Sequence, residues 1–478
     1  MKKDRCIVSV RHALMLMVLL LGLPSLSYAY DFVEDGFGYN RKIYPDNEVE
    51  VGCYYKFIGE VQIPSSVSYR GRTYKVTQIA YEGFKDCNEI TSVTIPNSMR
   101  NIYIAAFENC SSLRSITIPE NVSSIGASAF ENCSGLTSIA IPNVTSIGAF
   151  AFSGCRNLTS ITTPNVTSIG ESAFSDCRNL TSITTPNVTS IGASAFKNCS
   201  GLTSITLPEK VSGFATIGDY AFSGCSGLTS FTVPEGVDEI GEHTFSGCSG
   251  LTSIKIQEGV SEIGYGAFSG CSGLTSIVIP KSVTKMTGCY LDKCERLVSI
   301  SIPAKFVKGH VNNLSNLKSL TVFGDVDFKA RDVKKSNPSL DSITVADATY
   351  IGSEAFKSCG LTYLSIPNSV TSIGSNVFYD CWWKLSSLTI PCRYIDDNIL
   401  NCSRLQSLTV YGEEISHACS QLLARNPSLT TLTIKEATSI GESAFSGYRN
   451  LTSITLPEGV KTIGNSAFEN CSGLTSIT

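Results

Sequence analysis

Charge is scarce in this sequence: Asp, Glu, Lys and Arg make up only 16% of its 478 residues, and the formal net charge is −4. This balance provides no basic surface for nucleic acid or for an anionic membrane. The His-Glu-x-x-His, Gly-x-Ser-x-Gly and Gly-x-x-x-x-Gly-Lys patterns of known enzyme and phosphate sites are missing. We therefore expect a protein that is not an enzyme, holds no cofactor and binds no nucleic acid.

Metal-ligating patterns are also missing. Beyond residue 29 the histidines are His243, His310 and His417, each tens of residues from the next, and there is no Cys-x-x-Cys pair. Acidic residues recur between residues 235 and 262 and could bind Ca²⁺, but we interpret them as a solvated acidic face. We expect no metal site, and we interpret His243 as an exposed turn residue.

Long apolar runs are limited to one short segment near the N-terminus. Residues 13–23 follow several basic residues, and Ser27-Tyr28-Ala29 fits a small-x-small cleavage site. A bilayer span needs about 20 apolar residues, so this run is too short. We predict that residues 1–29 are a signal peptide, with an uncleaved anchor as the alternative. The protein is then not membrane-spanning, and it is secreted or displayed on a bacterial cell surface.

What the sequence does contain is a repeat. The pattern Phe-x-x-Cys-x-x-Leu recurs about every 23 residues, as in Phe130–Leu136, Phe152–Leu158 and Phe245–Leu251, and a Leu-x-x-Ile-x-Ile/Leu segment overlaps each copy. A fixed period of this length indicates one small unit stacked on itself. We count about 18 coils, spaced 20 to 26 residues apart. They predict an α/β-type repeat solenoid, a leucine-rich repeat arc with a parallel concave sheet and mostly short strands and turns on its convex side.

Strand alternation predicts which side chains form the concave surface. In the segment 228–233, Phe231 and Val233 should point inward while Ser230 and Thr232 point outward. Equivalent serines and threonines recur in most coils, and we call them the Ser/Thr rows. We interpret these rows as packing between neighbouring strands, because binding surfaces depend more on Tyr, Trp and Arg.

The repeat divides the chain into regions. We predict a β-rich N-terminal cap at residues 30–80, regular leucine-rich repeats at 81–303 and irregular repeats with longer convex helices at 304–433. Residues 434–478 are regular again and stop within a coil, which favours a truncated product over an edge that a partner covers.

The irregular part contains a second duplication. Residues 317–322 return 88 residues later as 405–410, so a block of about four coils was copied whole. Each copy is predicted to contain a longer amphipathic helix on the convex side. The apolar stripes of these helices are Val326, Ala330 and Val333 in the first copy and Ile415, Cys419 and Leu422 in the second.

Cysteine is the most regular chemical group. Of the 19 cysteines, 14 occupy one repeat position: Cys87, Cys110, Cys133, Cys155, Cys177, Cys199, Cys225, Cys248, Cys271, Cys294, Cys359, Cys381, Cys402 and Cys471. Their side chains should be parallel, which gives a poor disulfide torsion. We therefore predict a ladder of reduced, buried thiols that pack as small apolar groups. The sequence also permits a disulfide among the off-ladder residues Cys53, Cys289, Cys392 and Cys419, without indicating which of them would pair.

Units such as Ala221–Ser230 and Val144–Gly148 resemble the BspA-like leucine-rich repeats of bacterial surface proteins. The likeness covers residues 80–303 and 346–478 strongly and the middle weakly. It implies an adhesin-like protein whose partners are host matrix or bacterial surface proteins. A passive structural surface spacer and carbohydrate-surface binding are the alternatives.

Aromatic residues that interrupt the repeat are the candidates for partner binding. The two tryptophans stand together in an enlarged turn between Cys381 and Leu385, and three tyrosines lie near them in the sequence. Tryptophan and tyrosine dominate the binding energy of many protein interfaces. The candidate residues are Tyr363, Tyr379, Trp382, Trp383 and Tyr394.

Overall fold

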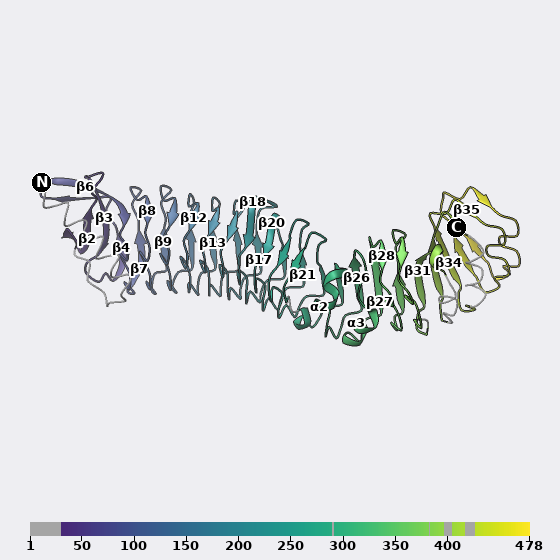
Figure 1. Cartoon of the computed structure of the whole chain (residues 1–478). Coiled ribbons are helices and arrows are strands. Elements are labelled where there is room, and N and C mark those ends of the chain that lie inside the picture. Colours follow the sequence, from purple (N-terminus) through teal and green to yellow (C-terminus); the bar gives the residue numbers. More distant parts are fainter. Residues whose placement is uncertain (1–29, 289–290, 382, 396–403, 416–425) are drawn as a thin grey trace.

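The computed structural model describes residues 30–288, 291–381, 383–395, 404–415 and 426–478. Figure 1 shows one long row of coils, with the two ends of the chain at opposite ends of the row. The row changes direction near α2 (Val307–His310) and α3 (Ala330–Ser336). It is a β-solenoid of about 18 coils with parallel strand pairing and few helices, which confirms the predicted fold class.

Each coil contributes one strand just after its leading leucine or isoleucine, and we call these the leucine strands. They pair in parallel and in register, as Ser160↔Ser182 and Ile161↔Ile183 illustrate. Their bounds are β7 (Ile90–Thr94), β9 (Ser115–Thr117), β11 (Ser138–Ala140), β13 (Ser160–Thr162), β15 (Ser182–Thr184), β17 (Ser204–Thr206), β19 (Ser230–Thr232), β21 (Ser253–Lys255), β23 (Ser276–Val278), β25 (Ser299–Pro303), β26 (Ser319–Phe323), β27 (Ser342–Ala346), β29 (Tyr363–Ser365), β31 (Ser387–Pro391), β32 (Ser407–Tyr411), β34 (Thr431–Lys435), β36 (Ser453–Thr455) and β38 (Ser476–Ile477).

The predicted alternation of faces is confirmed in these strands. In β19, Phe231 is buried between the exposed Ser230 and Thr232, and Val233 is buried directly after the strand. The Ser/Thr rows therefore lie on the outer surface of the leucine strands, where the polar side chains remain in water.

A second set of short strands lies on the other side of most coils, and we call them the return strands. They pair in parallel from coil to coil, as Ile147↔Ile169 illustrates. Their bounds are β8 (Asn101–Ile102), β10 (Ser124–Ile125), β12 (Ser146–Ile147), β14 (Ser168–Ile169), β16 (Ser190–Ile191), β18 (Lys210–Ile217), β20 (Glu235–Ile240), β22 (Glu262–Ile263), β24 (Lys285–Met286), β28 (Tyr350–Ile351), β30 (Ser372–Ile373), β33 (Glu414–Ile415), β35 (Ser439–Ile440) and β37 (Thr462–Ile463).

The N-terminal strands join both sets. β4 pairs in parallel with the leucine strand β7, while β6 pairs in parallel with the return strand β8. Two antiparallel pairs, β1 with β2 and β2 with β3, continue the return-strand sheet outward. Their role as a cap stays a prediction. The bounds are β1 (Phe32–Glu34), β2 (Phe37–Arg41), β3 (Glu48–Cys53), β4 (Gly59–Gln62), β5 (Ser66–Tyr69) and β6 (Arg72–Ile79).

From Phe84 to Phe268 the core contains a continuous stack of phenylalanines. The rings of Phe152, Phe174 and Phe196 are fully buried, and successive ring centroids are 5.3 Å apart with nearly parallel planes. This separation follows the ~4.8 Å spacing between paired strands. Each phenylalanine thus packs against the same residue of the coils before and after it.

The cysteine ladder runs beside this stack. The thiol of Cys177 is fully buried and donates a hydrogen bond to the backbone carbonyl of Phe152 in the preceding coil, 3.1 Å away. Cys155 and Cys199 do the same to the carbonyls of their preceding coils. Burial raises the pKa of the Cys177 thiol well above its usual value. The ladder residues from Cys110 to Cys294 thus pack as buried thiols, and each of them also donates to a backbone carbonyl, which the sequence had not indicated.

A glycine follows most of the return strands. At Gly148, a Cβ atom would lie 2.5 Å from the backbone nitrogen of Ala127 in the preceding coil. The left-handed turn conformation falls two residues later, at Phe150 (φ 59°). Glycine is therefore required because neighbouring coils approach closely, not because the turn bends at that residue.

Two coils of the duplicated block are short. The leading residues Leu297 and Leu317, and likewise Leu385 and Leu405, are only 20 residues apart. In both short coils the leucine strand passes directly into a 3₁₀ helix. These helices are η2 (Ala304–Phe306), which leads into α2, and η3 (Cys392–Tyr394); a further one, η1 (Leu291–Lys293), lies earlier in the chain.

The predicted convex helix of the first copy is α3, in the coil after the short one. Ala330 and Val333 are buried within it, whereas Val326 precedes the helix and forms a bridge with Ile351. In the second copy Ile415 is buried in β33, and Cys419 and Leu422 lie outside the described residues. No helix in the described part of the chain combines the length and apolar character that a bilayer span requires.

Candidate binding surface

Two of the predicted aromatic residues lie on one edge of the solenoid. Tyr379 and Trp383 belong to the segment that joins a return strand to the next leucine strand, and 53% and 59% of their surfaces are exposed. Their neighbour Trp382 lies outside the described residues. They are the most exposed of the predicted residues that the structure describes, so Tyr379 and Trp383 form the centre of the candidate surface.

The preceding coil supports both rings. A Cβ atom on Gly360 would lie 3.1 Å from Trp383 Cζ2, so the indole rests on backbone that carries no side chain. The Nζ atom of Lys357 lies 5.5 Å from the centroid of the Tyr379 ring, a cation–π distance. The backbone carbonyl of Tyr379 accepts the N–H of Ser358 at 3.0 Å. The two rings are therefore held by a coil that is itself fixed in the stack.

Tyr363 lies on a different surface. It begins the leucine strand β29, where it is half-buried and pairs with Ser342 on one side and Ser387 on the other. It takes the place of a serine in the Ser/Thr rows. A ring of this size adds an amphipathic contact to a face that otherwise carries short hydroxyl groups.

Tyr394 is separated from the other candidates. It lies in η3, beyond the far end of strand β31, whereas Trp383 precedes that strand. Its ring is half-buried, its hydroxyl donates to the carbonyl of Val370 at 3.1 Å, and the guanidinium of Arg393 lies 5.1 Å from its centroid. The structure thus places Tyr379 and Trp383 on one edge and Tyr394 on the opposite edge.

A row of rings in the regular coils was missed by the sequence analysis. His243 is half-buried, not exposed as predicted, because its ring stacks on Tyr220 at 4.8 Å and meets Tyr265 edge-on at 5.3 Å. Lys197 lies over the outer Tyr220 ring at 5.3 Å. Tyr220 and His243 lie two residues before the repeated phenylalanine of their coils, and Tyr265 lies three residues before it. Aligning the repeats with one another would have shown that these neighbouring coils carry aromatic residues at this point.

The acidic residues form a row across neighbouring return strands. Glu239 pairs in register with Glu262, and Glu262 with Lys285. Lys285 and Glu262 form an ion pair at 2.5 Å, and burial together with the charge of Glu262 raises the pKa of Glu239. Among the residues that the structure describes, no group of three His, Cys, Asp or Glu side chains is arranged to hold a metal ion.

Comparison with known families agrees with this architecture. A family model described as the BspA type leucine rich repeat region matches the chain in 6 copies, at residues 54–167, 129–215, 215–328, 334–437 and 420–478. These matches cover most of the chain. The chain belongs to the BspA-type leucine-rich repeat family.

Solved structures similar to this BspA-type chain are also leucine-rich repeat proteins. One from Bacteroides ovatus is 26% identical, with 94% of each chain covered and a TM-score of 0.47. One from T. pallidum is 31% identical over 41% of this chain and 90% of its own, with a TM-score of 0.37. A leucine rich cell surface protein from Faecalibacterium prausnitzii is 21% identical, covering 94% and 95% of the two chains, with a TM-score of 0.27. No curated protein matches the sequence.

Proposed function

We propose that this BspA-type protein is exported and acts as an adhesin-like binding protein at the bacterial surface, with host matrix or bacterial surface proteins as partners. The predicted signal peptide at residues 1–29 supports export. The observation that carries the proposal is the exposed pair Tyr379 and Trp383 on a rigid edge. Exposed aromatic residues supply much of the binding energy in protein interfaces.

The architecture favours binding without a large ordering cost. The rings rest on Lys357 and Gly360 of the preceding coil, and that coil is fixed by strand pairing on both sides. Side chains that are already positioned lose little freedom when a partner docks. A long row of coils also lets one molecule contact a repetitive surface at several places, which raises the overall affinity.

The test measures binding of the mature chain, residues 30–478, to immobilised fibronectin, laminin and collagen by surface plasmon resonance. We expect saturable binding to at least one of them. Combined Tyr379→Ala and Trp383→Ala substitutions should weaken it at least tenfold. Tyr350→Ala is the matched control, because this exposed tyrosine lies on the return strand β28, away from the edge.

Two outcomes oppose the proposal. If none of the matrix proteins binds in a saturable way, a passive structural spacer becomes the better description. If binding persists unchanged in the double variant while its thermal unfolding matches the wild type, the Tyr379 and Trp383 edge is not the binding surface.

A further inference from the structure

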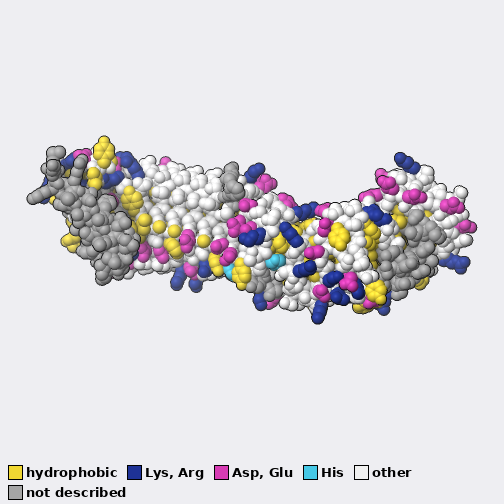
Figure 2. All heavy atoms as spheres, viewed as in Figure 1, with side chains coloured by type: hydrophobic (Ala, Val, Ile, Leu, Met, Phe, Trp, Pro, Cys, Tyr) yellow, Lys and Arg dark blue, Asp and Glu magenta, His cyan; other side chains and the backbone are white. Residues whose placement is uncertain are grey.

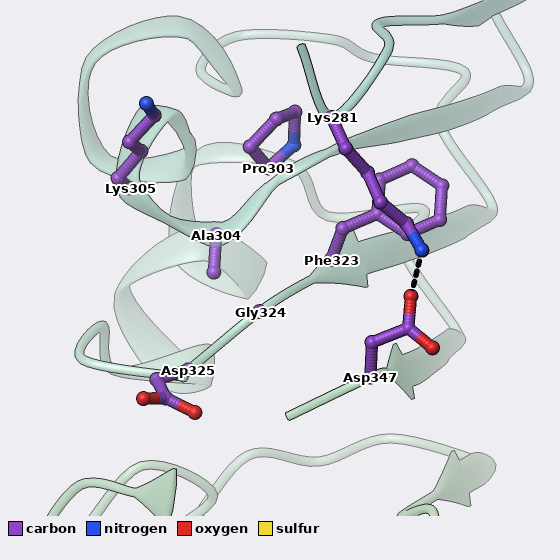
Figure 3. A pocket seen from close by; sticks show the side chains of 8 residues that line it. All are labelled: Lys281, Pro303, Ala304, Lys305, Phe323, Gly324, Asp325 and Asp347. Carbon is purple, nitrogen blue, oxygen red and sulfur yellow. Dashed lines mark hydrogen bonds and ion pairs between the residues drawn. The ribbon is translucent and has the colours of Figure 1, made fainter. Parts of the chain in front are cut away.

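A hollow of about 520 Å³ lies on the edge of the solenoid where the leucine strands end, opposite the edge that carries Tyr379 and Trp383. We call this edge the upper rim. Figure 3 shows an apolar floor formed by Pro303, Ala304, Phe323 and the backbone of Gly324. None of these residues belongs to the candidate surface around Trp383, and the hollow lies two to four coils earlier in the chain.

The hollow exists because the two coils beneath it have no long loop after their leucine strands at this rim. In the regular coils a loop separates the leucine strand from the return strand, as between β23 and β24. After β25, by contrast, the chain turns at once into η2, and after β26 it turns at Gly324 (φ 79°). The taller loops on either side remain as walls.

A bridge over the floor joins the two walls. The ammonium of Lys281 forms an ion pair with the carboxylate of Asp347, 66 residues later and three coils away. The same ammonium lies 5.4 Å from the centroid of the Phe323 ring. Three strand spacings amount to ~14 Å, longer than the two side chains can span on a straight stack. The bend of the row at α2 and α3 brings the walls closer at the rim (Figure 1).

The residues of the bridge and of the floor occur twice. In the second copy of the duplicated block, the amide of Asn368 donates to the carboxylate of Glu436 at 2.5 Å, 68 residues later. Asn368 follows a proline as Lys281 does, and Glu436 has the left-handed conformation of Asp347 (φ 63° and 56°). The floor also returns in register. Pro303 pairs with Phe323 in the first copy, and Pro391 pairs with Tyr411 in the second.

The chemistry of the two copies differs in an informative way. Both keep an aromatic ring, an acidic wall and a cation after the floor proline, Lys305 in the first copy and Arg393 in the second. The bridging donor changes from the charged Lys281 to the neutral Asn368. An anionic ligand group that pairs with the Lys281 ammonium in the first copy would find no positive charge at Asn368 in the second. A hydroxyl group, by contrast, can accept a hydrogen bond from either Lys281 or Asn368.

The charge balance points the same way. Around the first hollow, Lys281 and Lys305 are matched by Asp325 and Asp347. In the second copy, Arg393 and Lys435 are matched by the acidic residues Glu413 and Glu436. Neither copy has an excess of one sign, so neither attracts a charged ligand. Hydrogen-bond donors and acceptors above an apolar, aromatic floor suit a ring with hydroxyl groups at its edge and C–H groups on its face.

We propose that the hollow and the equivalent residues of the second copy are two matching subsites for the sugar rings of a neutral polysaccharide. Phe323 and Tyr411 lie four ladder steps apart, from β26 to β32, which corresponds to ~19 Å along the axis. A polymer of identical units can occupy both sites at once, and the second contact is then intramolecular. This activity goes beyond the protein binding proposed for the Trp383 edge and does not depend on it.

The experiment uses the mature chain and four soluble neutral polysaccharides, dextran, mannan, galactan and xylan, in affinity electrophoresis. We expect at least one to retard the protein. Isothermal titration with an oligosaccharide of the same sugar should give two sites per chain. Phe323→Ala or Tyr411→Ala alone should reduce this to one site, and should weaken polysaccharide binding at least tenfold because the second contact is lost. Both substitutions together should abolish binding.

Controls separate recognition from folding. Asp347→Asn and Glu436→Gln change only exposed walls and should lower the affinity of their own site alone, while Tyr265→Ala, in the regular coils, should change nothing. Retention of none of the four polysaccharides overturns the proposal. It is also overturned if binding survives the Phe323→Ala and Tyr411→Ala double variant, or if that variant loses matrix-protein binding instead, which would assign the two subsites to a peptide.

Discussion

The coils between residues 81 and 278 and those between 281 and 436 share the leading apolar position, but the second region keeps the repeated Phe and Cys in only some of its coils and presents a different surface. In the first region each phenylalanine stacks on the next, for example Phe130 on Phe152 at 5.3 Å. In the second region Phe356 and Phe378 are 6.2 Å apart, and helices replace some return strands. Figure 2 shows charged side chains gathered over the coils near α2 and α3, whereas the upper part of the coils of β11 to β17 shows few charged side chains.

The difference shows where a repeat protein can form a site. Coils of equal length give an even rim, because every loop is held against an identical loop. When a 20-residue coil is inserted, as from Leu297 to Leu317, its rim is lower than those of its neighbours and a hollow forms. Function in this family member is therefore expected where the period breaks, and packing where it holds.

The largest expected effect is the loss of a stacked ring. Phe174→Ala should cost about 3–5 kcal/mol, because the ring is fully buried between two others. Phe323→Ala, at the half-buried end of β26, should cost about 1 kcal/mol. Urea unfolding followed by circular dichroism measures both. Equal losses of unfolding free energy in the two variants would show that the phenylalanine stack contributes no more to stability than the residues of the upper rim.

The next effect concerns the approach of neighbouring coils. Gly148→Ala places a Cβ atom 2.5 Å from the backbone of the preceding coil and should cost about 1–3 kcal/mol. Gly309→Ala, in α2, meets no atom within 4 Å and should stabilise the protein by up to about 1 kcal/mol, since alanine favours helix. Thermal unfolding of both variants checks the contrast. A harmless Gly148→Ala would contradict the close-approach explanation.

A smaller effect is expected from the cysteines. Cys177→Ala leaves the carbonyl of Phe152 without its thiol donor and should cost about 1–2 kcal/mol. Cys392→Ala, in the second copy of the block, should cost less than about 0.5 kcal/mol, because alanine already occupies the equivalent position 304. The same unfolding assay compares them. A larger loss at Cys392 than at Cys177 would contradict the role of the ladder.

The smallest effect depends on pH. Lys357 and Lys329 donate to Glu354 and lower its pKa from 4.5 to about 2. A lowered carboxyl pKa adds stability that is fully present above pH 4.5 and is lost as the pH falls toward 2. The melting temperature of the wild type should slightly exceed that of Glu354→Gln at pH 6, and the two should converge near pH 2. A difference that does not change with pH would rule out this ion-pair contribution.

The candidate surface was only partly predictable. Exposure of Trp383 and Tyr379 follows from their place in an enlarged turn, and a break in the repeat is visible in the residue spacing. The separation of Tyr394 from Trp383 was not visible, because it depends on strand β31 running across the coil between them. The half-buried state of His243 was also missed, since its covering rings, Tyr220 and Tyr265, come from other coils.

The sequence by itself determined the period, the buried positions and the direction of each strand face, because these depend on local alternation repeated in every coil. It also identified the duplicated block. Only the tertiary structure decided that Lys281 reaches Asp347, that Gly148 is required by a neighbouring coil and that cysteine thiols satisfy phenylalanine carbonyls. These contacts join residues 21 to 66 positions apart, and they depend on how coils of unequal length stack and bend against one another.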